Sequence, residues 1–154
     1  MSSVEITELR PLKPEDLDRV VEIDARITGR SRQLFFEKRL QAALADPHGF
    51  IALAVEGAGA AIAGYAIARI QNGEFGDDHR VAVLDVIGVD PDTQHSGAGT
   101  ILLDGISARL KKMDIAELRT QVDWQDRDLM HFFAAAGFDL AFDQVLERPL
   151  ISAN

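Results

Sequence analysis

One continuous stretch, residues 81–110, constrains the fold more than any other part of the chain. Its first part, residues 81–89, is rich in β-branched side chains and predicts a buried strand. Pro91 ends that strand, because proline has no amide hydrogen to donate to a sheet ladder. Residues 94–100 then turn into a helix whose apolar positions recur at helical spacing. The first amides of this helix have no partner within it, so together with the helix dipole they favour binding of a phosphate.

The spacing of glycines in the turn separates three kinds of phosphate-binding sequence. A P-loop needs lysine after its last glycine, but Thr100 follows Gly99 directly. A dinucleotide-binding turn needs a third glycine where the chain has Leu102. The remaining pattern is Gln-x-x-Gly-x-Gly, preceded by Val-Asp-Pro. An ordinary strand-to-helix turn, with glycines present for packing, is the alternative interpretation.

The same pattern resembles the acetyl-CoA-binding motif of the GNAT family of N-acetyltransferases. That motif is Val-x-Pro, a short spacer, and then Arg or Gln-x-x-Gly-x-Gly or Ala. Two other stretches are also similar to the family. Residues 6–12, with Asp16 beyond them, look like its first strand and helix entry, and residues 126–138 resemble its Asn-x-x-Ala-x-x-x-Tyr-x-x-x-Gly-Phe segment. The resemblance therefore covers nearly the whole chain.

The order of expected elements predicts a single α/β (α+β) domain over residues 1–154. The expected strands are residues 4–10, 50–56, 60–71, 81–89, 116–122, 138–142 and 145–148. Helices are expected from Pro14 to Gly29, from Ser31 to Asp46, through the motif to Leu110, and over residues 126–136. The resemblance implies a mixed, mostly antiparallel sheet with helices on its faces. It also implies that the strands before and after the motif splay apart.

The resemblance further implies where acetyl-CoA, the acyl donor, lies. Its pantetheine arm is expected to pair with the backbone of Ile87, Gly88 and Val89, like an added strand. The residues expected around the pyrophosphate are Gln94, His95, Ser96, Gly97, Ala98, Gly99 and Thr100. Two interpretations remain for Gly88, a bulge or close approach of another backbone and a simple twist of the strand. His95 either donates to a phosphate or is exposed.

Asp85 is the candidate general base for acetyl transfer to an amine. In family relatives the base often comes from an inward residue of the strand before the motif, and Asp85 lies in an otherwise apolar run. An isolated carboxylate there would have a raised pKa, which suits a base working near neutral pH. The alternative is a structural carboxylate that is hydrogen-bonded to a neighbouring loop or helix.

The sequence departs from the family pattern at the position of the general acid. Phe133 stands where the family commonly has tyrosine, and Asp126 stands at the asparagine position. Asp126 and Phe133 are assigned to cofactor binding by the resemblance, although a plain core role for Phe133 fits equally well. Phenylalanine cannot donate a proton, so the thiolate leaves unaided, through water, or with help from another group. Tyr65 is a distant candidate for that group.

The acceptor site is expected near the junction of the first two helices, as in relatives. Arg26, Arg30 and Arg32 cluster there, and a carboxylate on the acceptor would explain them; charge pairing on the surface explains them as well. Arg30 is the substrate-binding candidate of the three. Trp124, the only tryptophan of the chain, is a second candidate, as a wall of the acceptor cleft.

Composition and net charge limit the classes of molecule that the protein is expected to bind. A net charge of -9 argues against nucleic acid or an anionic membrane and is compatible with an amine acceptor. The chain has no cysteine and its four histidines are scattered, so no metal site is expected. No apolar run suggests a signal peptide or a membrane span, which favours a cytoplasmic protein. A homodimer is compatible with the sequence, which leaves the oligomeric state open. The sequence therefore predicts an acyl-CoA-dependent N-acyltransferase, with a non-catalytic CoA-binding or interaction module on the same scaffold as the alternative.

Overall fold

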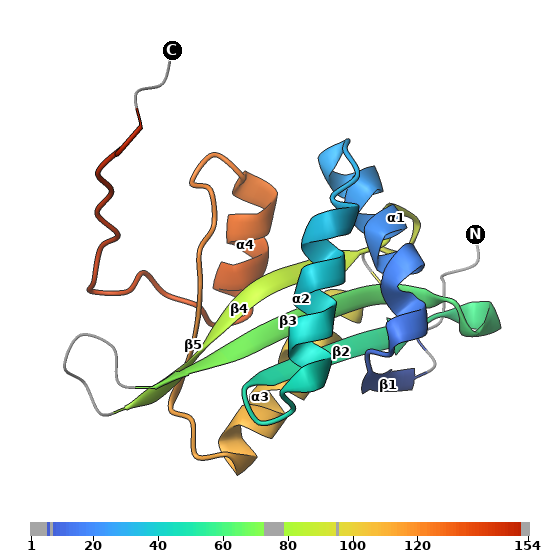
Figure 1. The fold of residues 1–154 in the computed structure, drawn as a ribbon, viewed down its shortest axis with the longest axis horizontal. Coiled ribbons are helices and arrows are strands. Elements are labelled where there is room, and N and C mark those ends of the chain that lie inside the picture. The colour runs from blue at the N-terminus through green and yellow to red at the C-terminus, as the bar shows by residue number, and fades with distance from the viewer. Residues whose placement is uncertain (1–5, 7, 73–78, 95, 152–154) are drawn as a thin grey trace. The chain divides into compact units, whose positions relative to one another are not determined.

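The computed structural model describes residues 6, 8–72, 79–94 and 96–151. Contacts divide the chain into two compact units, residues 1–121 and residues 122–154 (Figure 1). The first unit holds the whole sheet and three of the α-helices, and the second holds the remaining helix and the C-terminal segment. Within the described residues no helix is both long and apolar enough to cross a membrane.

A five-stranded sheet forms the centre of the first unit, in the order β1-β2-β3-β4-β5. The strands are β1 (Glu8–Pro11), β2 (Phe50–Glu56), β3 (Ile62–Asn72), β4 (Arg80–Val89) and β5 (Glu117–Thr120). Neighbouring strands are antiparallel except β4 and β5, which are parallel. The expected mixed, mostly antiparallel sheet is thus confirmed.

The first helices begin and end where the sequence has punctuating residues. Pro14 opens a 3-10 turn (Pro14–Asp16), in which the Asp16 carboxylate accepts the Lys13 amide at 2.8 Å. Helix α1 (Leu17–Thr28) follows, and Gly29 closes it with a left-handed φ of 81° and a bond from its amide to Ala25 O. Helix α2 (Gln33–Ala45) comes next, and both of its ends lie within two residues of the expected ones.

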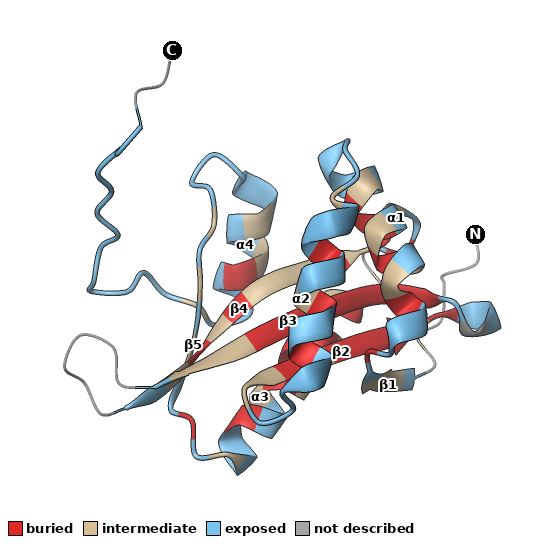
Figure 2. Cartoon of the chain, in the orientation of Figure 1, coloured by how far each residue is buried: buried red, intermediate tan, exposed pale blue. Residues whose placement is uncertain are grey.

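Helices cover both faces of the sheet (Figure 1). Phe36 and Leu40 of α2 share a buried cluster with Ile23 of α1 and with Tyr65 and Ile67 of β3. Helix α3 (Ala98–Lys112) packs on the opposite face, where it approaches β1 and β2 so closely that a Cβ on Gly105 would lie 2.6 Å from Leu9 Cδ2. The most buried residues therefore lie along β2, β3 and the facing sides of these helices (Figure 2).

The second unit contains helix α4 (Arg127–Ala135) and the segment that follows it. The Asp126 carboxylate caps the helix by accepting the Leu129 amide at 3.1 Å, and Gly137 follows its end with a φ of 93°. Phe133 is buried, and its ring contacts those of Phe132 and Phe138 at centroid distances of 5.3 and 5.0 Å. The unit thus has a small aromatic cluster of its own.

Two expected strands, residues 138–142 and 145–148, do not form. Their alternating apolar residues predicted strands, but a strand also needs a hydrogen-bonding partner, and residues 138–151 pair with no described strand. From Leu140 onward, the large apolar side chains of this segment are 67–105% exposed. Strand β1 ends at Pro11, one residue beyond the expected end, and a proline is possible there because β1 is an edge strand. The expected strand at residues 4–10 falls partly outside the described residues.

Candidate functional site

Strand β4 changes its surroundings halfway along its length. Its pairing with β5 stops at Leu84 and Thr120, whereas its pairing with β3 continues to Val89 and Gly64. Asp85 is an extra residue at this point, a bulge between the pairs Leu84–Ala68 and Val86–Ile67. Residues 85–89 are therefore paired with described strands on one side only. This arrangement matches the splayed strands expected from the family resemblance.

The turn after β4 presents the start of α3. Gly97 adopts a left-handed φ of 88°, and its carbonyl accepts the first helical bond, from the Ile101 amide at 3.0 Å. The amides of Ala98, Gly99 and Thr100 precede that bond and have no partner within the helix.

Ser96 adds a second feature to this turn. Its hydroxyl oxygen is buried and has no hydrogen-bond partner among the described residues. A buried hydroxyl without a partner is costly, and a phosphate oxygen at the helix start would satisfy it. The residues present thus fit a pyrophosphate. Gln94 is exposed at the beginning of the turn, and His95 lies outside the described residues.

Asp90, the middle residue of Val-Asp-Pro, fastens this turn to α1. Its carboxylate accepts the Asp92 amide at 3.0 Å, Arg19 Nη2, and Arg26 Nη1 at 2.6 Å. Burial alone would raise the pKa of Asp90, but the hydrogen bonds from Asp92 and Arg19 outweigh it and hold that pKa below its ordinary value. The network also fixes the position of Pro91 and the 3-10 turn (Pro91–Thr93) ahead of the phosphate-binding turn.

Replacing Asp90 by asparagine is expected to lower the free energy of unfolding by about 2–3 kcal/mol at neutral pH, because a buried charge with several donors is lost. Since the pKa of Asp90 is depressed on folding, its stabilisation is complete above about pH 4 and disappears as the pH falls through the folded-state value. Chemical denaturation of the wild type and the variant from pH 7 to pH 2 measures whether their free energies of unfolding become equal as the pH falls.

The matched control is Asp92→Asn, because Asp92 pairs with the same Arg26 but its side chain is 73% exposed. We expect Asp92→Asn to change the free energy of unfolding by no more than about 0.5 kcal/mol. Equal losses in the two variants would show that Asp90 does not anchor the turn.

Asp85 is not the isolated carboxylate that the sequence suggested. Arg69 Nε from β3 donates to it at 3.0 Å and Arg39 Nη1 from α2 at 3.2 Å, and its side chain is 12% exposed. The premise of an unpaired carboxylate in an apolar strand is therefore wrong. Each carboxylate oxygen accepts one of these two hydrogen bonds, and since a carboxylate has about four lone-pair directions, acceptor capacity remains. Arg69 follows the apolar run of residues 62–68 in β3, but nothing local in the sequence pairs it with Asp85.

The three arginines near the helix junction have separate surroundings. Arg26 binds Asp90 and Asp92, and Arg32 forms a bidentate pair with Asp24 at 2.6 and 2.9 Å. The side chain of Arg30 has no ion pair with a described residue and is exposed. Charge pairing within the protein thus accounts for Arg26 and Arg32, while Arg30 remains the candidate for binding an acceptor.

Gly88 is required by a close contact with a side chain. A Cβ at this position would lie 2.5 Å from the hydroxyl oxygen of Tyr65 and 2.6 Å from its Cζ. Tyr65 is the cross-strand partner of Gly88, and its ring occupies the space that a side chain would need. Neither sequence interpretation of Gly88 included this contact, and the bulge lies at Asp85.

The remaining predicted site residues belong to the second unit. Trp124 is 77% exposed, Asp126 caps α4, and Phe133 lies in the aromatic cluster described above. Their predicted contacts with an acceptor or cofactor stay predictions. Among the described residues no group of three or more His, Cys, Asp or Glu side chains is arranged to hold a metal ion.

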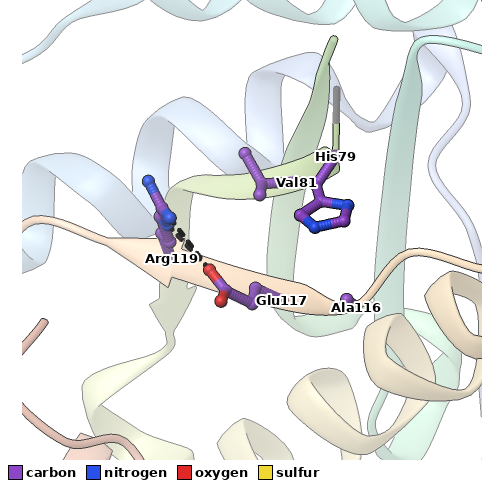
Figure 3. Close-up of a pocket in the computed structure, with 5 residues that line it drawn as sticks. All are labelled: His79, Val81, Ala116, Glu117 and Arg119. Carbon is purple, nitrogen blue, oxygen red and sulfur yellow. Dashed lines mark hydrogen bonds and ion pairs between the residues drawn. The ribbon is translucent and has the colours of Figure 1, made fainter. Parts of the chain in front are cut away.

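Two hollows open on the first unit. One, of about 300 Å³, runs along α2 and is lined by Phe35, Lys38, Arg39 and Ala42. The other, of about 80 Å³, lies at the start of β4 and β5, where Glu117 and Arg119 pair at 2.9 Å beside His79 and Val81 (Figure 3). The first hollow shares Arg39 with the Asp85 cluster. The second lies at the end of β4 away from the phosphate-binding turn.

Comparison with known proteins agrees with this geometry. Residues 17–138 match the model of the acetyltransferase (GNAT) family. The chain belongs to the GNAT family. The family match spans α1, the motif and α4, and so confirms the resemblance, although the first of the three similar stretches, residues 6–12, lies outside the matched range. A sequence comparison with curated proteins gives no match.

Solved structures of low sequence identity share the GNAT fold of this protein. The BH1408 protein of Bacillus halodurans, in a tetramutant form, is 16% identical with a TM-score of 0.80, over 94% of this chain and 100% of its own. An aminoglycoside 6′-N-acetyltransferase of Acinetobacter haemolyticus is 17% identical (TM-score 0.77; 95% and 100%). Glucosamine-6-phosphate N-acetyltransferase of Arabidopsis thaliana is 14% identical (TM-score 0.71; 92% and 97%).

Proposed function

We propose that this GNAT protein transfers the acetyl group of acetyl-CoA to an amine, which attacks the thioester directly. The observation that carries the proposal is the continuity of two features. The one-sided stretch of β4, residues 85–89, leads directly into a turn with free helix amides and the buried, unpartnered hydroxyl of Ser96. An extended chain of amides that ends in a pyrophosphate fits this sequence of features.

Each part of the donor has a counterpart in the chain. The backbone of Ile87, Gly88 and Val89 is proposed to pair with the pantetheine amides. Residues 94–100 are proposed to bind the pyrophosphate through the α3 amides and Ser96. Because a net charge of -9 repels phosphates at long range, this local cluster of donors supplies the favourable interaction.

The reaction needs a proton acceptor close to the thioester. A bond forms between the amine nitrogen and the carbonyl carbon, the carbon–sulfur bond breaks, and the amine loses a proton. Asp85 is the ionisable side chain at the start of the one-sided stretch of β4. We propose that the incoming ammonium group takes the place of Arg39 or Arg69 on this carboxylate, which accepts one proton and so leaves a neutral amine. The second proton leaves the nitrogen after the attack and passes to solvent.

The acceptor is proposed to lie in the hollow along α2. Arg39 links this hollow to Asp85, and the guanidinium of Arg39 lies 5.3 Å from the Phe35 ring centroid. An amine with an apolar portion suits such a lining, and Arg30 suits a carboxylate or phosphate at the far end of the acceptor. Three of the similar structures are named as acetyltransferases of an aminoglycoside, of glucosamine 6-phosphate and of a ribosomal-protein alanine. Amines of these three kinds are therefore the first acceptors to test.

Acetyl-CoA is expected to raise the melting temperature of the protein in a concentration-dependent way, because a ligand that binds only the folded state stabilises it. Adenosine, which lacks both pyrophosphate and pantetheine, is the control and should produce a much smaller shift. Equal shifts with the two compounds, or none with acetyl-CoA, would contradict the proposed donor site.

A non-catalytic CoA-binding protein is the second candidate. It is favoured by the occupied carboxylate of Asp85 and by phenylalanine at position 133. Both candidates predict the thermal shift, but only the enzyme predicts release of free thiol that depends on an added amine.

A further inference from the structure

The only tyrosine of the chain, Tyr65, lies in β3, and its hydroxyl reaches over to β4, the strand that is proposed to bind the acyl donor. Tyr65 is 1% exposed, and its ring meets Phe36 of α2 edge to face at a centroid distance of 5.7 Å. Its other side faces β4, where a Cβ on Gly88 would lie 2.5 Å from the hydroxyl oxygen. The absence of a side chain at Gly88 therefore brings the phenol end against the backbone of β4.

Gly88 belongs to the stretch of β4 that lies beyond its pairing with β5. The register places Gly88 opposite Tyr65, two residues after Val86 and four after the last β5-paired residue, Leu84. The phenol thus lies over the part of the strand where the pantetheine and thioester are proposed to pair.

The hydroxyl has no hydrogen-bond partner among the described residues, although buried tyrosine hydroxyls usually have one. The nearest charged groups satisfy each other: Arg32 binds Asp24 through two hydrogen bonds, and the guanidinium of Arg32 also stacks over Phe36 at 5.3 Å. The hydroxyl is therefore left as a donor without an acceptor in this part of the protein.

The surroundings also keep the phenol protonated. Burial raises the pKa of Tyr65 well above its ordinary value, the charge of Asp24 raises it further, and Arg32 opposes both. Because the pKa is raised, the hydroxyl remains a neutral donor at neutral and moderately alkaline pH. It is suited to donating a hydrogen bond to a developing negative charge and unsuited to accepting a proton.

We propose that the Tyr65 hydroxyl, placed over Gly88, donates a hydrogen bond to the sulfur of the acyl donor as the carbon–sulfur bond breaks. This inference rests on the proposed acetyl transfer. The amine proton goes to Asp85, the coenzyme leaves as a thiolate that accepts the hydrogen bond, and solvent protonates it afterwards. Tyr65 would thus stabilise the leaving group in a chain that has phenylalanine at the family's tyrosine position.

The variant Tyr65→Phe removes the hydroxyl and keeps the ring. Its melting temperature is expected within about 4 °C of wild type, because the hydroxyl has no partner in the described structure. The Kd for CoA should change by less than about threefold, whereas kcat should fall about tenfold to a hundredfold, less than for a donor to an oxyanion because sulfur is a weaker acceptor. An unchanged kcat in the folded variant would overturn the proposal.

Fluorine NMR supplies a measurement independent of turnover. Since the chain has one tyrosine, replacement by 3-fluorotyrosine gives one resonance, from position 65. We expect CoA to shift it more than desulfo-CoA, which lacks the sulfur. Equal shifts would overturn the proposal even if kcat falls, because the hydroxyl would then act elsewhere. If wild-type protein binds no CoA or transfers no acetyl group, the proposed function itself fails, which is visible before any variant is made.

Discussion

Replacing Gly97 by valine is expected to weaken acetyl-CoA binding by at least about a hundredfold. Gly97 has a φ of 88°, a conformation that a β-branched residue adopts only under strain of about 1–2 kcal/mol. No atom lies within 4 Å of the position of a new Cβ, so the effect comes from the backbone and not from crowding. Relaxation of the turn would move the first α3 amides, and hydrogen bonds to a charged group contribute about 1.5–3 kcal/mol each. Isothermal titration with acetyl-CoA measures the loss.

Gly59→Val is the matched control. Gly59 has a φ of 84° and equally open space around its Cβ position, but it lies in the β2–β3 connection. Both variants should lose comparable stability, and only Gly97→Val should lose affinity. A folded Gly97→Val protein with wild-type affinity would show that the turn does not bind the pyrophosphate.

The second large effect is expected at Asp85. Asp85→Asn keeps the shape of the side chain and removes the proton acceptor, so kcat should fall by about two to four orders of magnitude. The Kd for acetyl-CoA should stay within about threefold, because the proposed donor contacts use the backbone of residues 87–89 and the turn. Steady-state rates over pH, together with titration calorimetry, separate the two quantities.

Arg39→Gln distinguishes a base from a structural anchor. It breaks one ion pair of the cluster but leaves the carboxylate in place. If Asp85 accepts the proton, this change should alter kcat by less than about tenfold, as expected for loss of a partly exposed ion pair. If the two variants lose the same activity, the cluster serves to hold α2 and β3 on β4, and another group or bulk water carries the proton.

The stretch from β4 to α3 was the most predictable part of the molecule, because its signals are local. A β-branched run, Pro91 and the glycines around Ser96 each act within a few residues, and the structure has β4, the turn and α3 in the expected places. The same holds for Pro14 and Gly29 at the ends of the first helical segment.

The surroundings of Asp85 could not be read from the sequence. Arg69 is 16 residues away along the chain and Arg39 is 46 residues away, and they meet Asp85 only because β3 pairs with β4 while α2 packs over both. The contact of Tyr65 with Gly88 depends on a register that the bulge at Asp85 shifts by one residue. Such pairings follow from tertiary structure, and no local pattern records them.

In the C-terminal segment, the sequence predicted strands that the structure does not have. The alternation of Phe138, Leu140 and Phe142 is a genuine strand pattern, yet Leu140 and Phe142 are almost fully exposed. Periodicity indicates which face of a strand would be buried, but it cannot supply the neighbouring strand that completes the hydrogen bonds.

The central claim is transfer of an acetyl group to an amine at the β4–α3 site. The most direct measurement mixes the protein, acetyl-CoA and a panel of amino sugars, aminoglycosides and alanine-terminated peptides, and follows free thiol and acetylated amine in the same sample. We expect at least one amine to yield thiol and acetylated product in equal amounts, and neither product with Gly97→Val. Binding of acetyl-CoA by the wild-type protein without amine-dependent thiol release, across the whole panel, would contradict the account and favour a non-catalytic CoA-binding protein.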